Sequence, residues 1–349
     1  MRLLALALLV AAPQAFYGAD IVLERGTVVR LADAQGGGEI LGRHDDFINA
    51  LSPFDRSARL ETKGPVSTEG FVEFVSRQAL EFSGPEGDNL VSAVAGIRAA
   101  LLRLDSHLPL PPTVYIVKTT GREEAGAAYH RGDAIILPRE FLRLPPAGLS
   151  SVLSHELFHV LSARDGDLRR DLYALVGFEP CNDVPLPKDF ADRKITNPDE
   201  PRDDFSIEVS YKGRSIRVMP VLFASTAEYD PSGGKSLFDY LQQRLMAVDQ
   251  EDGRVVPSIV DGKPLMLEAS AVPDYGRKLG AGIEYLIQPD EVLAVDFASL
   301  LAGKETSIAP GVLAGMKRLL SKGRSPLTEK TPRRDSDQPP LAKDPQGAD

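Results

Sequence analysis

The pentapeptide His155-Glu156-Leu157-Phe158-His159 constrains this chain more than any other segment. It lies within an apolar stripe of helical period, formed by Leu149, Val152, Leu153, Leu157, Val160 and Leu161. Pro145-Pro146 can begin a helix there, and Asp165-Gly166 can end it because Gly166 is free to take the left-handed conformation. Residues four apart on a helix share a face, so both imidazoles are expected to project together from an otherwise apolar helix.

Two imidazoles on one helical turn can both reach one metal ion, at about 2.0–2.1 Å for zinc. Glu156 lies one position round the helix, where it can reach a water held in the open coordination position. Cys181 is the single cysteine, which excludes an intrachain disulfide and a multi-cysteine zinc site. We therefore expect one zinc ion at His155 and His159, with Glu156 as general base and a carboxylate as third ligand.

The H-E-x-x-H helix resembles that of the zincin superfamily of zinc metallopeptidases, over about residues 130–165. Residues 283–300 resemble the glutamate helix of the gluzincin branch, E-x-x-A-D or E-x-x-x-D, and the helix expected over residues 288–298 opens with proline and acidic residues. The resemblance implies Glu291 as third zinc ligand and an aspartate that braces a ligand histidine. In this chain Val295 occupies the expected position, and the aspartate follows one residue later, at Asp296.

Two other carboxylates compete with Glu291. Asp165 stands where the metzincin pattern places its third ligand, but Ser162 replaces the glycine of that pattern. Glu179 has a spacing close to that of thermolysin-like gluzincins, but the proline after it disfavours helix. Glu291 is preferred because regular helical backbone holds a ligand at a fixed angle.

The resemblance also implies a peptide or protein substrate. In zincins a strand ahead of the metal helix pairs with the substrate backbone, and Ala134 to Leu137 lies in that place. Tyr285 and His130 are candidates for donating a hydrogen bond to the oxyanion. Their ordinary interpretations are a strand core residue for Tyr285 and a solvated turn residue for His130.

Helices and strands are mixed without regular βαβ alternation, which predicts the α+β class. Helices are expected over residues 67–78, 88–104, 236–248 and 288–298, strands over 113–118 and 134–137, and a hairpin over 206–221 that turns at Lys212-Gly213. By resemblance, the fold is a zincin-like domain with a mixed sheet packed on the H-E-x-x-H helix and a mainly helical C-terminal half.

A short basic start and an apolar run over residues 3–12 are typical of a secretory signal. Gly36-Gly37-Gly38 indicates a flexible break, and the proline-rich, charged end of the chain has little to bury. The expected parts are a signal peptide (1–19), an extended leader (20–44), a catalytic domain (45–321) and a disordered tail (322–349). The protein is therefore expected to be secreted or periplasmic.

The excess of acidic over basic residues bears on which kinds of molecule the protein can bind. There are 50 acidic and 40 basic residues, a net charge of −10, which argues against nucleic acid. No stretch reaches 18 apolar residues, so no membrane span is expected. The expectation is an exported metallopeptidase, and the alternative is a non-catalytic envelope protein that uses the metal helix as a binding module. Glu156 favours the peptidase, because a scaffold needs no acid beside the open zinc position. The oligomeric state stays open.

Overall fold

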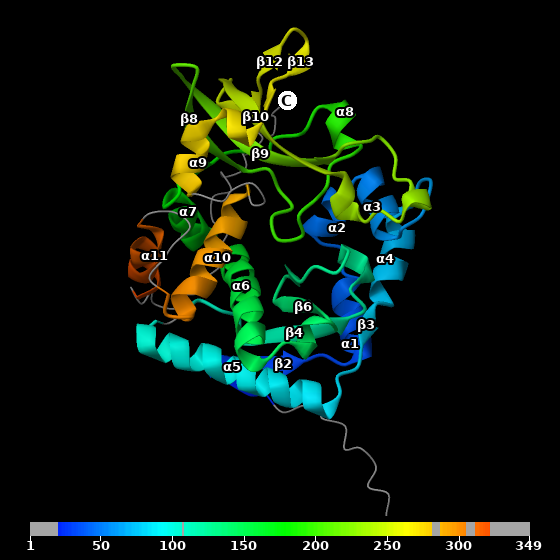
Figure 1. Ribbon diagram of the computed structural model, residues 1–349, viewed down its shortest axis with the longest axis vertical. Coiled ribbons are helices and arrows are strands. Elements are labelled where there is room, and N and C mark those ends of the chain that lie inside the picture. Colours follow the sequence, from blue (N-terminus) through cyan, green and yellow to red (C-terminus); the bar gives the residue numbers. More distant parts are fainter. Residues whose placement is uncertain (1–19, 107, 281–286, 305–310, 322–349) are drawn as a thin grey trace, which may run out of the picture.

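The computed structural model describes residues 20–106, 108–280, 287–304 and 311–321. Their fold is α+β, as the sequence predicts. A mixed sheet lies in the lower part of Figure 1 and an antiparallel sheet in the upper part. Helices α6 (Pro146–Arg164) and α10 (Pro289–Leu301) stand beside the mixed sheet and below the antiparallel one. Among the described helices, none is long and apolar enough to cross a membrane.

The first sheet has the strand order β1-β2-β4-β6-β5, and β3 also pairs with β4. Its strands are β1 (Ile21–Glu24), β2 (Thr27–Leu31), β3 (Ala79–Leu80), β4 (Thr113–Thr119), β5 (Tyr129–Arg131) and β6 (Ala134–Pro138). Strands β2, β4 and β6 are parallel, and β1, β3 and β5 pair antiparallel to their neighbours. The parallel strands β4 and β6 lie inside the sheet, which accounts for their apolar runs.

Helices cover both faces of this sheet. They include α1 (Ala34–Leu41), α2 (Asp46–Ala50), α3 (Pro53–Arg59), α4 (Thr68–Ser76) and α5 (Gly84–Leu104). Val114 and Ile116 of β4 pack with α5 and α6 in the main core, whereas Val117 faces the second core of α1, α2 and α4. This alternation follows from the two-residue period of a strand. The H-E-x-x-H helix therefore rests on a mixed sheet, as the sequence predicts.

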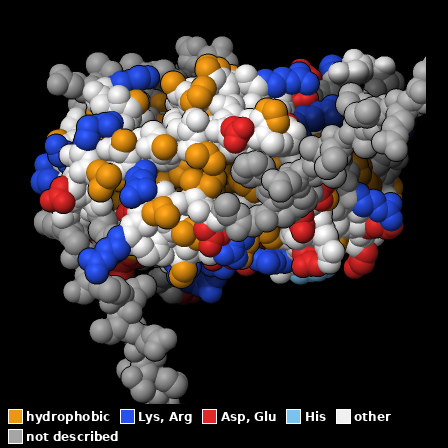
Figure 2. Space-filling view, turned by 90° about the horizontal axis from the view of Figure 1, so that it is seen from below, with side chains coloured by type: hydrophobic (Ala, Val, Ile, Leu, Met, Phe, Trp, Pro, Cys, Tyr) orange, Lys and Arg blue, Asp and Glu red, His pale blue; other side chains and the backbone are white. Residues whose placement is uncertain are grey.

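Helix α5 is the lowest element in Figure 1, and Figure 2 shows the molecule from that side. Hydrophobic side chains gather near the middle of this view. Val91 and Leu102 of α5 are among the exposed hydrophobic residues. Lys and Arg side chains are scattered around them, and those drawn in colour form no continuous basic patch.

The second sheet is antiparallel, with the order β11-β10-β9-β8-β7 and β14 beside β10. Its strands are β7 (Phe178–Pro180), β8 (Phe205–Tyr211), β9 (Arg214–Ala224), β10 (Leu241–Glu251), β11 (Arg254–Pro257) and β14 (Met266–Leu267), and a separate hairpin pairs β12 (Ile259–Val260) with β13 (Lys263–Pro264). The β8–β9 hairpin turns at Lys212-Gly213 as predicted, with both residues at positive φ. The remaining helices are α7 (Gly166–Ala174), α8 (Lys188–Ala191), α9 (Pro273–Leu279) and α11 (Val312–Ser321).

The predicted helix over residues 236–248 is wrong. Residues 237–240 form a short 3-10 helix, and strand β10 begins at Leu241. The apolar spacing that suggested a helix belongs to a strand that is paired along both edges, where sheet hydrogen bonds outweigh local periodicity. The prediction of a mainly helical C-terminal half is also wrong, because residues 178–267 contain the second sheet. Helices dominate only from α9 onward.

Residues 20–44 are not an extended leader, because β1 and β2 belong to the first sheet and Gly36-Gly37-Gly38 lies inside α1. A Cβ on Gly38 would lie 2.7 Å from the backbone oxygen of Ser76, so this glycine lets α1 approach α4 closely. The domain thus includes residue 20 onward. The predicted signal peptide (1–19) and tail (322–349) lie outside the described residues.

Candidate metal centre

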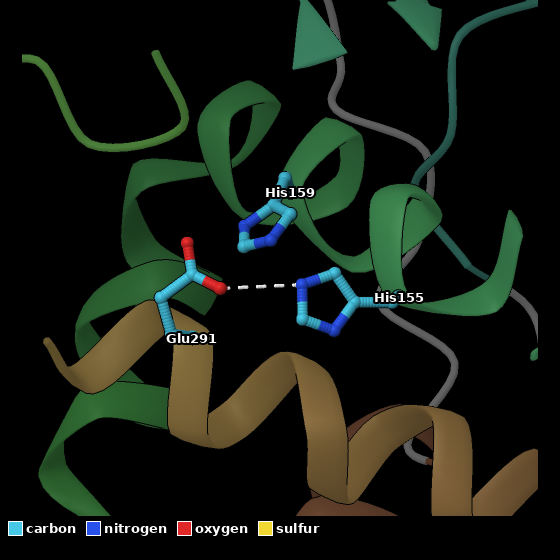
Figure 3. A group of neighbouring side chains, drawn as sticks. All are labelled: His155, His159 and Glu291. Carbon is cyan, nitrogen blue, oxygen red and sulfur yellow. Dashed lines mark ion pairs between the residues drawn. The ribbon is translucent and has the colours of Figure 1, made fainter. Parts of the chain in front are cut away.

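Helix α10 packs against α6 and brings His155, His159 and Glu291 together (Figure 3). One ligand atom of each residue lies within 4.8 Å of the corresponding atoms of the other two. His155 Nε2 is 3.3 Å from Glu291 Oε2, and the two imidazole centroids are 4.9 Å apart. Glu291 projects from the first turn of α10, which Pro289 begins. These are the three residues that the sequence suggests as ligands.

His159 provides the test of whether these residues fit a metal ion. It is fully buried, and neither ring nitrogen has a hydrogen-bond partner among the described residues. Asp290 Oδ2 lies 3.2 Å from His159 Nδ1, which is an ion-pair distance without hydrogen-bond alignment. A buried polar group without a partner costs about 1–3 kcal/mol. A metal ion would supply the missing partner, so the donor set fits zinc.

The competing ligand candidates lie elsewhere. Asp165 is the N-cap of α7, where its side chain accepts hydrogen bonds from the backbone N–H groups of Asp167 and Leu168. The predicted left-handed stop at Gly166 is wrong, because that residue begins α7. Glu179 lies on β7 with a side chain 67% exposed, and it pairs with Arg217 at 2.9 Å. Neither carboxylate belongs to the group of three.

Negative charge is crowded around the helix. The carboxylates of Glu156 and Asp199 form a second group with His159, within 4.8 Å. Burial raises the pKa of Glu156 well above its usual range, and the charge of Asp199 adds to that effect. Burial opposes ionisation of Asp290 too, but the adjacent His159 outweighs it and lowers the pKa of Asp290 to about 2. Such a cluster of buried acids favours a bound cation.

Sequence reasoning missed two residues of the site. Asn197 donates a hydrogen bond to Glu291 Oε1 at 2.9 Å, and Asp199 Oδ1 lies 2.6 Å from His130 Nδ1. His130 is a buried residue of β5 whose ring stacks on that of His159 at 5.9 Å, so its interpretation as a solvated turn residue is wrong. Both missed residues lie in a polar loop between α8 and β8, and no motif there signals a role.

Three further expectations concern the bracing aspartate, the strand that would pair with substrate, and Tyr285. Asp290 lies 3.2 Å from the candidate ligand His159, and Asp296, for which the resemblance suggests the bracing role, is also buried and stays a prediction for that role. Strand β6 cannot receive a substrate strand, because β4 and β5 already pair with its two edges. The outer strand of the sheet is β5. Tyr285 lies outside the described residues.

A cavity of about 240 Å³ opens beside His155 and Glu291. Its apolar lining comes from the second sheet (Leu222 and Leu241), from the short 3-10 helix before β10 (Phe238) and from loops (Ala127, Ala128, Ile195, Pro198 and Ile287). Glu124 also lines it and is held by two hydrogen bonds from the fully buried guanidinium of Arg59. His155 and Glu291 are therefore reached through a recess whose lining residues are half apolar and half polar.

The chain matches no protein-family model, no curated protein and no solved structure.

Proposed function

We propose that this chain is a zinc-dependent metallopeptidase of gluzincin-like arrangement that hydrolyses peptide bonds. The observation that carries the proposal is the convergence of His155, His159 and Glu291, with Glu156 beside them on the same helix. The first 19 residues, by their composition, support a secreted or periplasmic location.

His155, His159 and Glu291 are the residues that would hold one zinc ion. Zinc bound there would polarise the scissile carbonyl and lower the pKa of its water to about 7. Glu156 accepts the proton from the attacking water and delivers it to the leaving amine. Asp290 keeps the His159 ring in place through its contact with Nδ1.

The surroundings of the site support a peptide as substrate. The outer strand β5 offers an edge to which an extended backbone could add. The 240 Å³ cavity beside His155 has room for one apolar side chain, and half of its lining residues are apolar. We therefore expect cleavage next to an apolar residue.

One observation favours a second candidate, a non-catalytic metal-binding envelope protein. Glu156 is only 4% exposed, and its Oε2 has no hydrogen-bond partner among the described residues. A general base that cannot reach a substrate would leave metal binding as the remaining role.

The test is cleavage of an internally quenched peptide library by the zinc-loaded full chain. We expect cleavage that a chelator abolishes and that one equivalent of zinc restores. Zinc bound at one equivalent without any cleavage would favour the second candidate, and failure to bind zinc would contradict both.

A further inference from the structure

The segment Asn197-Pro198-Asp199 crosses the metal centre. Asn197 is hydrogen-bonded to Glu291, on one side of the centre. Asp199 Oδ1 accepts a hydrogen bond from the backbone N–H of His130 at 2.8 Å, on the side of β5. The carboxylate of Asp199 also lies in the group that contains Glu156 and His159. The segment therefore runs from the third ligand, past the general base, to the outer strand.

Two cavities lie on either side of this segment. The cavity of about 240 Å³ includes residues 127–128, just before β5. A second cavity of about 430 Å³ includes residues 131–132, at the other end of β5. Pro198 and Asp199 line both of them. The segment thus separates two hollows that would otherwise form one groove along the outer strand.

The position of Asp199 closes the site in two ways. Its carboxylate accepts the hydrogen bond from the backbone N–H of His130, a donor that an added substrate strand could otherwise use. It also lies against Glu156, whose Oε2 is inaccessible, although a general base must come within hydrogen-bond reach of its proton. A peptide along β5 and this segment therefore compete for the same place.

Both ends of the segment are anchored to buried charged residues, and its middle is held by hydrogen bonds from Asn197 to Glu291 and from His130 to Asp199. Thr196 donates backbone and hydroxyl hydrogen bonds to the buried carboxylate of Asp55. On the other side, Glu200 is buried and pairs with Arg169 at 3.2 Å. Only the three residues between these anchors need to move for the groove to open.

We propose that Asn197-Pro198-Asp199 is a built-in plug that keeps the metal centre latent, and that peptide binding requires its displacement. This inference rests on the proposed peptidase function. On this proposal, the burial of Glu156 is a regulatory feature. It therefore no longer favours the non-catalytic candidate.

The test uses the Asp199→Ala variant, with Asp199→Asn as a milder change should the alanine variant fold poorly. Asp192→Ala is the matched control, since Asp192 is an exposed acid on the same connection that pairs with Lys188. The first readout is labelling of the metal-free chain by diethyl pyrocarbonate, located by mass spectrometry. The second is kcat/KM of the zinc-loaded chain on a quenched peptide.

We expect wild type and Asp192→Ala to be labelled at His155 and protected at His130 and His159. Asp199→Ala should label the protected pair about tenfold faster and raise kcat/KM by a similar factor, as the loss of a charge-assisted hydrogen bond allows. Unchanged labelling together with lower kcat would overturn the plug and make Asp199 a positioning residue. Because labelling needs neither zinc nor turnover, it tests the plug even if the proposed function fails.

Discussion

Glu156 is the residue on which the proposed chemistry depends. It shares helix α6 with His155 and His159 but lies outside the group of three ligands. Glu156→Gln keeps the size of the side chain and removes its ability to accept a proton. We predict that the variant retains zinc and its melting temperature, while turnover falls by about 10²–10⁴-fold. Metal analysis and peptide kinetics on the same preparation measure both, and near-normal turnover would rule out this mechanism.

Glu124 gives the protein a pH dependence that is independent of the metal. It lies with Asp55 around the fully buried guanidinium of Arg59, whose one positive charge faces two carboxylates. Burial raises the pKa of Glu124 from its usual 4.5 to about 7, and Arg59 opposes that shift only in part. Between these values the folded chain binds the proton and the unfolded chain releases it. The contribution of Glu124 to the free energy of unfolding is therefore present below pH 4.5 and lost as pH rises through 7.

Glu124→Gln removes this titration. We predict that the free energy of unfolding falls less steeply between pH 5 and pH 7.5 in the variant than in wild type, by no more than about 3 kcal/mol. Urea unfolding of both proteins at the two pH values, with chelator present, measures the difference. Parallel pH profiles would show that Glu124 does not take up a proton on folding.

Among the elements, α1 depends on how closely it approaches α4. A Cβ on Gly38 would meet the backbone oxygen of Ser76 at 2.7 Å, and backbone cannot move aside as a side-chain end can. We predict that Gly38→Ala lowers the free energy of unfolding by about 1–3 kcal/mol. Gly84→Ala is the control, because nothing lies within 4 Å of its added Cβ at the start of α5. Equal melting temperatures for the two variants would contradict close packing of α1.

Elements with a one-sided stripe and a clear cap could be predicted from the sequence. Helix α4 begins after Ser67, whose side chain caps it, and α10 begins at its proline, both as predicted. Helix α5 begins at Gly84, earlier than predicted, because Ser83 and Glu86 form a capping box ahead of Asp88. The C-terminal end of strand β10 does carry a local signal, because the two-residue turn at Asp252-Gly253 pairs it with β11, whereas its pairing with the more distant strand β9 leaves none.

The residues of the candidate site also differ in how far local sequence predicts their positions. His155, Glu156 and His159 are contiguous on one helix, so their geometry follows from the helical repeat alone. Asn197 and Asp199 reach the site only through the folding of a loop over it, which local sequence does not encode. The buried state of His130 likewise depends on the position of β5 in the sheet.

The extent of the whole domain can be tested by truncation. Leu23, Val29 and Leu41 are buried in the cores that β1, β2 and α1 help to form. We predict that removing residues 1–19 and 322–349 leaves the melting temperature nearly unchanged. Extending the N-terminal deletion to residue 44 should abolish cooperative unfolding, because it removes two strands of the first sheet. A stable protein lacking residues 1–44 would restore the interpretation of residues 20–44 as a leader.

The central claim is that two segments far apart in the sequence form one zinc site. The most direct measurement is titration of zinc into the metal-free chain, in competition with a chromogenic chelator, for wild type and three carboxylate variants in parallel. We predict one tight equivalent in wild type, loss of tight binding in Glu291→Ala, and wild-type affinity in Glu179→Ala and Asp165→Ala, since those carboxylates pair with Arg217 and cap α7. Tight zinc binding retained by Glu291→Ala would contradict the claim.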